Sequence, residues 1–168
     1  MPRAIKAYVR IVDAVNYRVG RFAMYLLYVM MAILIWSTVS KVTPWPSIWT
    51  LEMAQFVMVA YYMLGGPYSL QLDSNVRMDL LYHRWSPRTR AWVDAFSVFA
   101  LLFYLGVLLY GAIESTVYSL EYAERSATAW RPYIAPIKIV MSVAVLLMLL
   151  QSIALFFRDV AKIRGEEI

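Results

Sequence analysis

Several residue types that serve as ligands or nucleophiles are missing or rare in this chain. Among its 168 residues there is no cysteine, which excludes disulfides, thiolate metal sites and cysteine nucleophiles. A single histidine, His83, excludes a haem held between two histidines of one chain. Charged residues make up only 16% of the chain, against about a quarter in a typical soluble domain. Since 62% of the residues are hydrophobic, the composition indicates a membrane protein.

Four long segments contain no Asp, Glu, Lys or Arg, and they lie at 22–40, 53–72, 95–113 and 139–157. A helix rises about 1.5 Å per residue, so about 20 residues cross a hydrocarbon core of about 30 Å. Buried helices of a soluble bundle would show a polar stripe, which these segments almost lack. The sequence therefore predicts an all-α membrane protein, with residues 1–168 in a single membrane domain. The transmembrane helices are expected at about 20–40, 48–70, 90–115 and 136–158.

The basic residues are unevenly distributed between the two sides of these predicted spans. Twelve of the sixteen lie before residue 22, between residues 73 and 94, or after residue 157. The positive-inside rule then predicts a multi-pass protein with both termini in the cytoplasm and the connection 114–135 on the outer side. The net charge of +5 is explained by contact with anionic membrane lipid. Nucleic acid is not expected as a partner.

Two shorter segments are expected to lie on the cytoplasmic membrane surface. Residues 1–20 are basic, and their apolar side chains form one stripe of a helix: Ile5, Val9, Val12 and Val19. Such a segment before a span is typical of an interfacial helix, although a disordered basic tail would fit the same residues. A second interfacial helix is expected near 76–85, with His83 at the membrane surface. We also expect Ser47 to cap the second span, Pro87 to start the third, and Gly65–Pro67 to bend the end of the second.

Glu52 and Lys138 lie at the outer ends of the second and fourth predicted spans. They could pair with each other, pair with a partner subunit, or extend to the membrane surface. The deeper polar residues Ser97, Ser142 and Gln151 are expected to form hydrogen bonds between helices. No nucleophile, acid–base pair or ligand cluster has the spacing of a reaction centre. The sequence therefore predicts that the protein is not an enzyme and holds no metal or cofactor.

Three functions of a small membrane protein can be compared with this pattern. A solute carrier acting alone needs polar groups near the midplane, and this chain has few. A self-contained four-helix exporter would need a carboxylate in its first span, and 22–40 has none. A haem-free membrane anchor for another complex remains open as an alternative.

Two groups of residues carry a family resemblance. The segment 47–92 contains, in order, Trp49, Glu52, Gly65, Gly66, Val76, Arg77 and Asp79. The segment "SATAWRPYIAPIK" contains Ser126, Trp130, Pro132, Pro136 and Lys138. In this order and at these helix ends, they resemble the small four-helix "Q" subunit of tripartite ATP-independent periplasmic (TRAP) transporters. Asn75 stands where that family often has a histidine.

The resemblance implies a scaffold role in the bacterial inner membrane. The small subunit would hold a large, many-span subunit that performs secondary active uptake with a sodium gradient, and it would bind no ion itself. It would also form part of the docking surface for a periplasmic substrate-binding protein, commonly one for an organic acid or other carboxylate. The residues expected at subunit interfaces or in structural contacts are Glu52, Lys138, Trp49, Arg77, Asp79, Trp130 and Pro132.

Overall fold

The computed structural model describes residues 3–72 and 87–164, and these residues are organised as long helices. The helices are α1 (Arg3–Val42), α2 (Thr50–Gln71), α4 (Pro87–Glu121) and α5 (Ala135–Arg164). Between Arg125 and Tyr133 there is one isolated β-bridge, and no other strand pairing occurs in the described ranges. The predicted all-α architecture is confirmed. The interfacial helix expected near 76–85 lies outside the described residues.

Three of the described helices are long and apolar enough to cross a membrane: Arg3–Val42, Phe96–Glu121 and Ala135–Arg158. The helix α2 has 22 residues, which correspond to about 33 Å of helix. Its length is therefore sufficient for a span, but it is not among the three helices that are both long and apolar enough. The fourth span stays a prediction.

The helix α1 differs from the expected arrangement near residue 20. Residues 3–20 were expected to be a surface helix separate from the first span, but Arg3–Val42 is one continuous helix of 40 residues. At about 1.5 Å per residue it is about 60 Å long, roughly twice the thickness of a hydrocarbon core. A large part of α1 therefore extends beyond any membrane that it crosses.

The apolar stripe at the beginning of α1 packs against protein instead of lipid. Val9 and Val12 are buried in a cluster with Ala154 of α5. Around this cluster are packed the partly buried side chains of Ile5, Tyr8, Leu150 and Phe157. The location of residues 1–20 at the membrane surface stays a prediction, but Val9 and Val12 of the stripe are covered by the end of α5. Periodicity shows which residues share a face but not which element meets that face.

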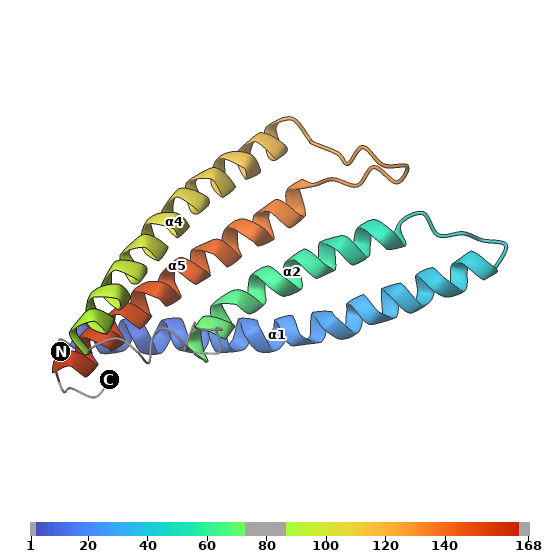
Figure 1. Cartoon of the computed structure of the whole chain (residues 1–168). Coiled ribbons are helices and arrows are strands. Elements are labelled where there is room, and N and C mark those ends of the chain that lie inside the picture. Colours follow the sequence, from blue (N-terminus) through green and yellow to red (C-terminus); the bar gives the residue numbers. More distant parts are fainter. Residues whose placement is uncertain (1–2, 73–86, 165–168) are drawn as a thin grey trace.

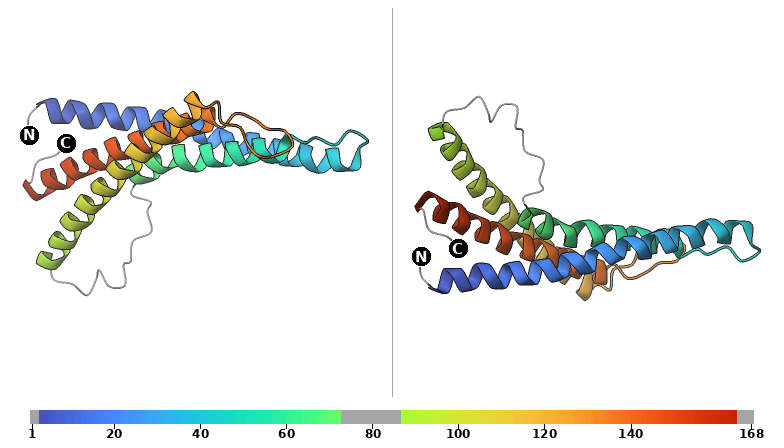
Figure 2. Two further views of the ribbon diagram at one scale, coloured as in Figure 1. Left: turned by 90° about the horizontal axis from the view of Figure 1, so that it is seen from above. Right: turned by 90° about the horizontal axis from the view of Figure 1, so that it is seen from below.

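The helices form two antiparallel pairs, α1 with α2 and α4 with α5 (Figure 1). α5 also contacts α2 and α1 and so joins the pairs. The end of α5 lies beside the beginning of α1, and the two pairs lie apart at the opposite end (Figure 1). We call these the terminal end and the loop end of the bundle. Figure 2 shows that the beginning of α4 lies away from the other helices at the terminal end.

Most large apolar side chains of α1 and α4 are exposed in the isolated chain. On α4 these include Phe96, Phe99, Phe103 and Tyr110, and on α1 they include Phe22, Tyr25, Tyr28 and Trp36. Exposed apolar surfaces of this extent mark contact with a membrane or with another protein. The largest fully buried side chains are mostly polar, and three of them, Asn16, Gln151 and Thr50, form hydrogen bonds between helices.

The residues expected to cap, begin or bend the helices were confirmed only in part. α4 begins at Pro87 as predicted. The N-cap residue of α2 is Trp49, without a capping bond from its side chain, so the capping role expected for Ser47 was wrong. α2 continues through Gly65, Gly66 and Pro67 as far as Gln71, and the bend expected there stays a prediction.

Candidate functional site

Glu52 is a buried acid in the first turn of α2. Only 8% of the residue is exposed, and its Oε2 atom has no hydrogen-bond partner among the described residues. The start of a helix favours a negative charge, which compensates part of the cost of burial. A buried carboxylate oxygen without a donor is nevertheless unfavourable. A donor that reached this oxygen would therefore stabilise it.

A chain of hydroxyl groups fixes the start of α2 to the end of α1. Ser40 Oγ lies 2.7 Å from Ser47 Oγ, which lies 3.3 Å from Thr50 Oγ1. Thr50 Oγ1 in turn donates to Ser37 Oγ at 3.1 Å. Ser37, Ser40 and Thr50 are buried. Because Thr50 precedes Glu52 by two residues, these bonds hold the turn that carries the acid.

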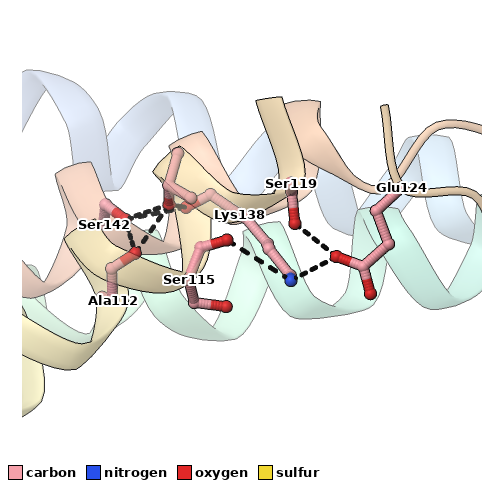
Figure 3. Close-up of polar contacts among 7 residues, drawn as sticks. Ala112, Ser115, Ser119, Glu124, Lys138 and Ser142 are labelled. Carbon is pink, nitrogen blue, oxygen red and sulfur yellow. Dashed lines mark hydrogen bonds and ion pairs between the residues drawn. The ribbon is translucent and has the colours of Figure 1, made fainter. Parts of the chain in front are cut away.

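Lys138 does not pair with Glu52. Its Nζ atom donates to Glu124 Oε2 at 2.7 Å and to the carbonyl oxygen of Ser115 at 3.5 Å. Ser119 Oγ donates to the same carboxylate oxygen of Glu124 (Figure 3). A Glu52–Lys138 pair was one of the alternatives considered from the sequence, and it is not formed in the described chain. The lysine instead fixes the connection between α4 and α5.

Next to this ion pair, hydroxyl groups join α4 to α5. Thr116 Oγ1 and Ser142 Oγ are 2.8 Å apart, and Ser142 Oγ also donates to the carbonyl oxygen of Ala112 at 3.1 Å. Thr116 Oγ1 also lies 3.3 Å from the carbonyl oxygen of Lys138. The predicted interhelical role of Ser142 is confirmed. Ser97, by contrast, is exposed on α4.

The connection between α4 and α5 folds back on itself as a short hairpin. The amide of Ser126 donates to the carbonyl oxygen of Pro132 at 3.0 Å, and the amide of Ile134 donates to that of Glu124 at 3.1 Å. The guanidinium of Arg125 lies over the ring of Tyr133, 4.1 Å from its centroid. Trp130 lies within this hairpin and is exposed. The hairpin therefore presents an aromatic surface at the loop end of the bundle.

The ion pair of the hairpin gives a prediction about pH. The hydrogen bond from Lys138, and next the one from Ser119, lowers the pKa of the Glu124 carboxyl below its ordinary value of 4.5. A lowered pKa stabilises the folded state above the unfolded value, and this contribution is lost as pH falls through the folded value. We expect the hairpin to keep its order from neutral pH to about 4.5 and to loosen below it. Trp130 fluorescence measures this change.

The control for this prediction is Glu124→Gln, which keeps the size of the side chain but cannot titrate. The fluorescence change below pH 4.5 should be absent in this variant. The five other tryptophans are separated by recording the same titration with Trp130→Phe. A transition of equal size in Glu124→Gln and in the wild type would contradict the assignment.

A second polar cluster joins α1 to α5 near the terminal end. Asn16 Nδ2 donates to Gln151 Oε1 at 2.5 Å, and Gln151 Nε2 donates to Asp13 Oδ1 at 3.0 Å. Arg158 forms an ion pair with the other carboxylate oxygen of Asp13. From α2, Gln71 Nε2 donates to the carbonyl oxygen of Asp13 at 3.2 Å. We call these five residues the Asp13 network.

The sequence predicted only one member of this network. Gln151 was expected to bond between helices, and this is confirmed. Asp13 and Arg158 were considered only as charges on the cytoplasmic side, and Asn16 gave no signal. The spacing of Asp13 and Asn16 by three residues, on a stripe with Val9 and Val12, could have shown that both face another helix.

The structure does not gather the expected site residues into one place. Trp49 is exposed at the start of α2, whereas Trp130 and Pro132 belong to the hairpin between α4 and α5. Arg77 and Asp79 lie outside the described residues. Within the described part of the chain, no group of three or more His, Cys, Asp or Glu residues could hold a metal ion.

Long helices, exposed apolar faces and polar side chains that join neighbouring helices define this chain as an integral membrane protein. The family model described as tripartite ATP-independent periplasmic transporters, DctQ component, matches residues 30–162. The match spans most of the chain, and the protein belongs to this family of small TRAP transporter subunits. The resemblance noted from Trp49 to Lys138 is thereby confirmed. No curated protein and no solved structure matches the chain.

The family consists of transporter components and not of enzymes. Its match begins within α1 and ends within α5, so it includes α2 and α4 completely. Residues 1–29, which contribute Asp13 and Asn16, lie outside the matched region. The family assignment leaves the exporter and the anchor without specific support.

Proposed function

We propose that this protein is the scaffold subunit of a TRAP-type uptake system in the bacterial inner membrane, with both termini in the cytoplasm. It holds a large, many-span subunit that carries the solute and uses the sodium gradient. The polar side chains of the described helices support this division of labour. They are largely occupied in bonds between helices, as in the Asp13 network and the Thr116–Ser142 contact. Such groups are not arranged as a path for a solute.

The observation that carries the association with the large subunit is the buried Oε2 atom of Glu52. A donor from a neighbouring chain that reached this acceptor would stabilise it, and an arginine or lysine would form a charge-assisted bond. The hydroxyl groups of Ser37, Ser40 and Thr50 hold the acid in place before the partner binds. Glu52 is thus proposed to be an interface residue.

The loop end is proposed to contribute to docking of a periplasmic substrate-binding protein. The connection between α1 and α2 and the hairpin between α4 and α5 both lie at this end (Figure 1). They expose Trp45, Trp49, Trp130 and Tyr133, and aromatic residues of this kind anchor protein interfaces. The solute is proposed to be an organic acid or another carboxylate.

Co-purification with the large subunit tests the role of Glu52. The variant Glu52→Ala removes the acceptor and should lower the affinity between the subunits about 10-fold to 100-fold, because hydrogen bonds to charged groups contribute about 1.5–3 kcal/mol. The matched control is Glu121→Ala, which removes an exposed carboxylate at the end of α4. Equal recovery of the large subunit with wild type, Glu52→Ala and Glu121→Ala would exclude the proposed role.

A further inference from the structure

A groove of about 370 Å³ lies between α1 and α2, on the half of the bundle nearer the terminal end. Its volume is within the range of small-molecule sites, about 300–1,000 Å³. The residues that line it are small or aromatic, with one methionine and one serine: Gly20, Ala23, Met24, Tyr61, Tyr62, Gly65, Gly66, Tyr68 and Ser69. The groove is therefore mainly apolar.

The groove opens to the outside of the bundle. Met24 is 54% exposed and Tyr62 is 63% exposed. A Cβ atom added at Gly65 would meet no atom within 4 Å, so this glycine leaves open space in the groove wall. Gly20 and Tyr68 are in close contact on the other side, where a Cβ atom at Gly20 would lie 2.4 Å from Tyr68 Cγ. In a membrane this opening faces acyl chains, unless another helix covers it.

A cation lies beside the groove, on the side nearer the terminal end. The guanidinium of Arg21 is 5.7 Å from the centroid of the Tyr17 ring. The Tyr17 ring is in turn 6.0 Å from the ring of Tyr68, which lines the groove. Tyr17 lies one turn closer to the start of α1 than Arg21, so the cation is directed toward that end. This is where a lipid headgroup would lie if its acyl chain entered between Met24 and Tyr62.

The other charges described near Arg21 also favour an anion. Arg18 is exposed in the same turn of α1. The nearest acid in the sequence, Asp13, is already paired with Arg158. Among the described residues the local balance is therefore positive, which matches the phosphate of an anionic lipid.

We propose that this groove binds one anionic phospholipid, with its headgroup at Arg21 and an acyl chain between α1 and α2. The lipid would belong to the leaflet at the terminal end of the bundle. The proposal depends on the membrane location of the helices and not on the association with the large subunit. The lipid would fill the space left by Gly65 and stabilise the contact of α1 with α2.

Native mass spectrometry of the full chain in a non-ionic detergent tests the headgroup. The probes are dioleoylphosphatidylglycerol and dioleoylphosphatidylcholine, which share acyl chains and differ in net charge. The wild type should bind the first molecule of the anionic lipid about fivefold more tightly, as expected for one basic residue near the headgroup. Arg21→Gln should lose this preference. The control Lys41→Gln, which removes an exposed basic residue at the opposite end of α1, should keep it within about twofold.

The variant Gly65→Phe tests the acyl chain because it fills the open space of the groove and should weaken binding of both lipids. Equal binding of the two lipids by the wild type would overturn the proposal. So would equal losses in Arg21→Gln and Lys41→Gln, or unchanged binding in Gly65→Phe.

A photoreactive residue in place of Tyr62 distinguishes the lipid from a protein occupant. The variant is illuminated in membranes that also contain the large subunit. A phospholipid adduct is the expected product. An adduct with the large subunit would show that a protein helix covers the groove and would overturn the lipid site. That result would leave the proposed scaffold role intact, and the two proposals are therefore tested separately.

Discussion

Replacement of Asp13 by alanine is expected to lower the free energy of unfolding by about 2 kcal/mol. The carboxylate accepts from Gln151 Nε2 and pairs with Arg158, so its removal leaves both groups without their acceptor. Loss of one partner of a buried ion pair costs about 3–5 kcal/mol. The cost here is smaller because the side chains of Asp13 and Arg158 are 17% and 29% exposed and water can reach them. Unfolding by SDS in mixed micelles measures the change.

A double-mutant cycle separates the ion pair from the rest of the Asp13 network. Arg158→Met keeps the length of the side chain but removes its charge. If the two residues act as a pair, Asp13→Ala should cost less in the Arg158→Met background than in the wild type. Glu121→Ala serves as the control for removal of an exposed carboxylate. A loss for Asp13→Ala no greater than that for Glu121→Ala would contradict a stabilising role.

Helix existence could be predicted from the sequence, but helix length could not. Segments without charge report where a chain can cross a membrane, whereas backbone hydrogen bonds continue into charged residues beyond it. The first span was expected at about 20–40, and the helix is Arg3–Val42. The fourth was expected at about 136–158, and the helix is Ala135–Arg164. In both cases the extra turns carry basic residues.

The partners of the polar residues were the hardest feature to predict. Lys138 binds Glu124, only 14 residues away across the hairpin, and not Glu52 on another helix. A short loop closes at a lower entropic cost than a long one, which favours the local partner. Gln151 is the opposite case, because its hydrogen-bond partner Asn16 lies 135 residues away in the sequence. A hydrogen bond over that separation depends on how α1 and α5 pack, and a single sequence does not contain that geometry.

The roles of the glycines could not be predicted from the sequence either. From the sequence, Gly65–Pro67 were expected to bend the end of the second span, while Gly20 had no assigned role. In the structure, Gly20 is where α1 comes closest to the side chain of Tyr68 on α2. Gly65 faces open space, and Gly66 faces the terminal methyl group of Met148. The effect of replacing each glycine therefore depends on which atoms lie opposite it.

Gly20→Ala is therefore expected to be the most disruptive of the glycine-to-alanine substitutions at these helix positions. Its Cβ atom would lie 2.4 Å from Cγ and 2.5 Å from Cβ of Tyr68, atoms that cannot move without a shift of α2. Overpacking of this kind costs about 1–3 kcal/mol. Alanine is about 1 kcal/mol more favourable than glycine inside a helix. This gain offsets only part of an overpacking cost near about 3 kcal/mol.

Two other glycines provide matched controls for this substitution. At Gly66 the added atom meets only Met148 Cε, the end of a flexible side chain that can rotate away, so the cost should be small. At Gly106 nothing lies within 4 Å, and alanine should be neutral or stabilise the helix. SDS unfolding in mixed micelles should thus rank Gly20→Ala as least stable, then Gly66→Ala, then Gly106→Ala. Equal stabilities for Gly20→Ala and Gly106→Ala would show that the approach of α1 to Tyr68 does not limit the packing of α1 on α2.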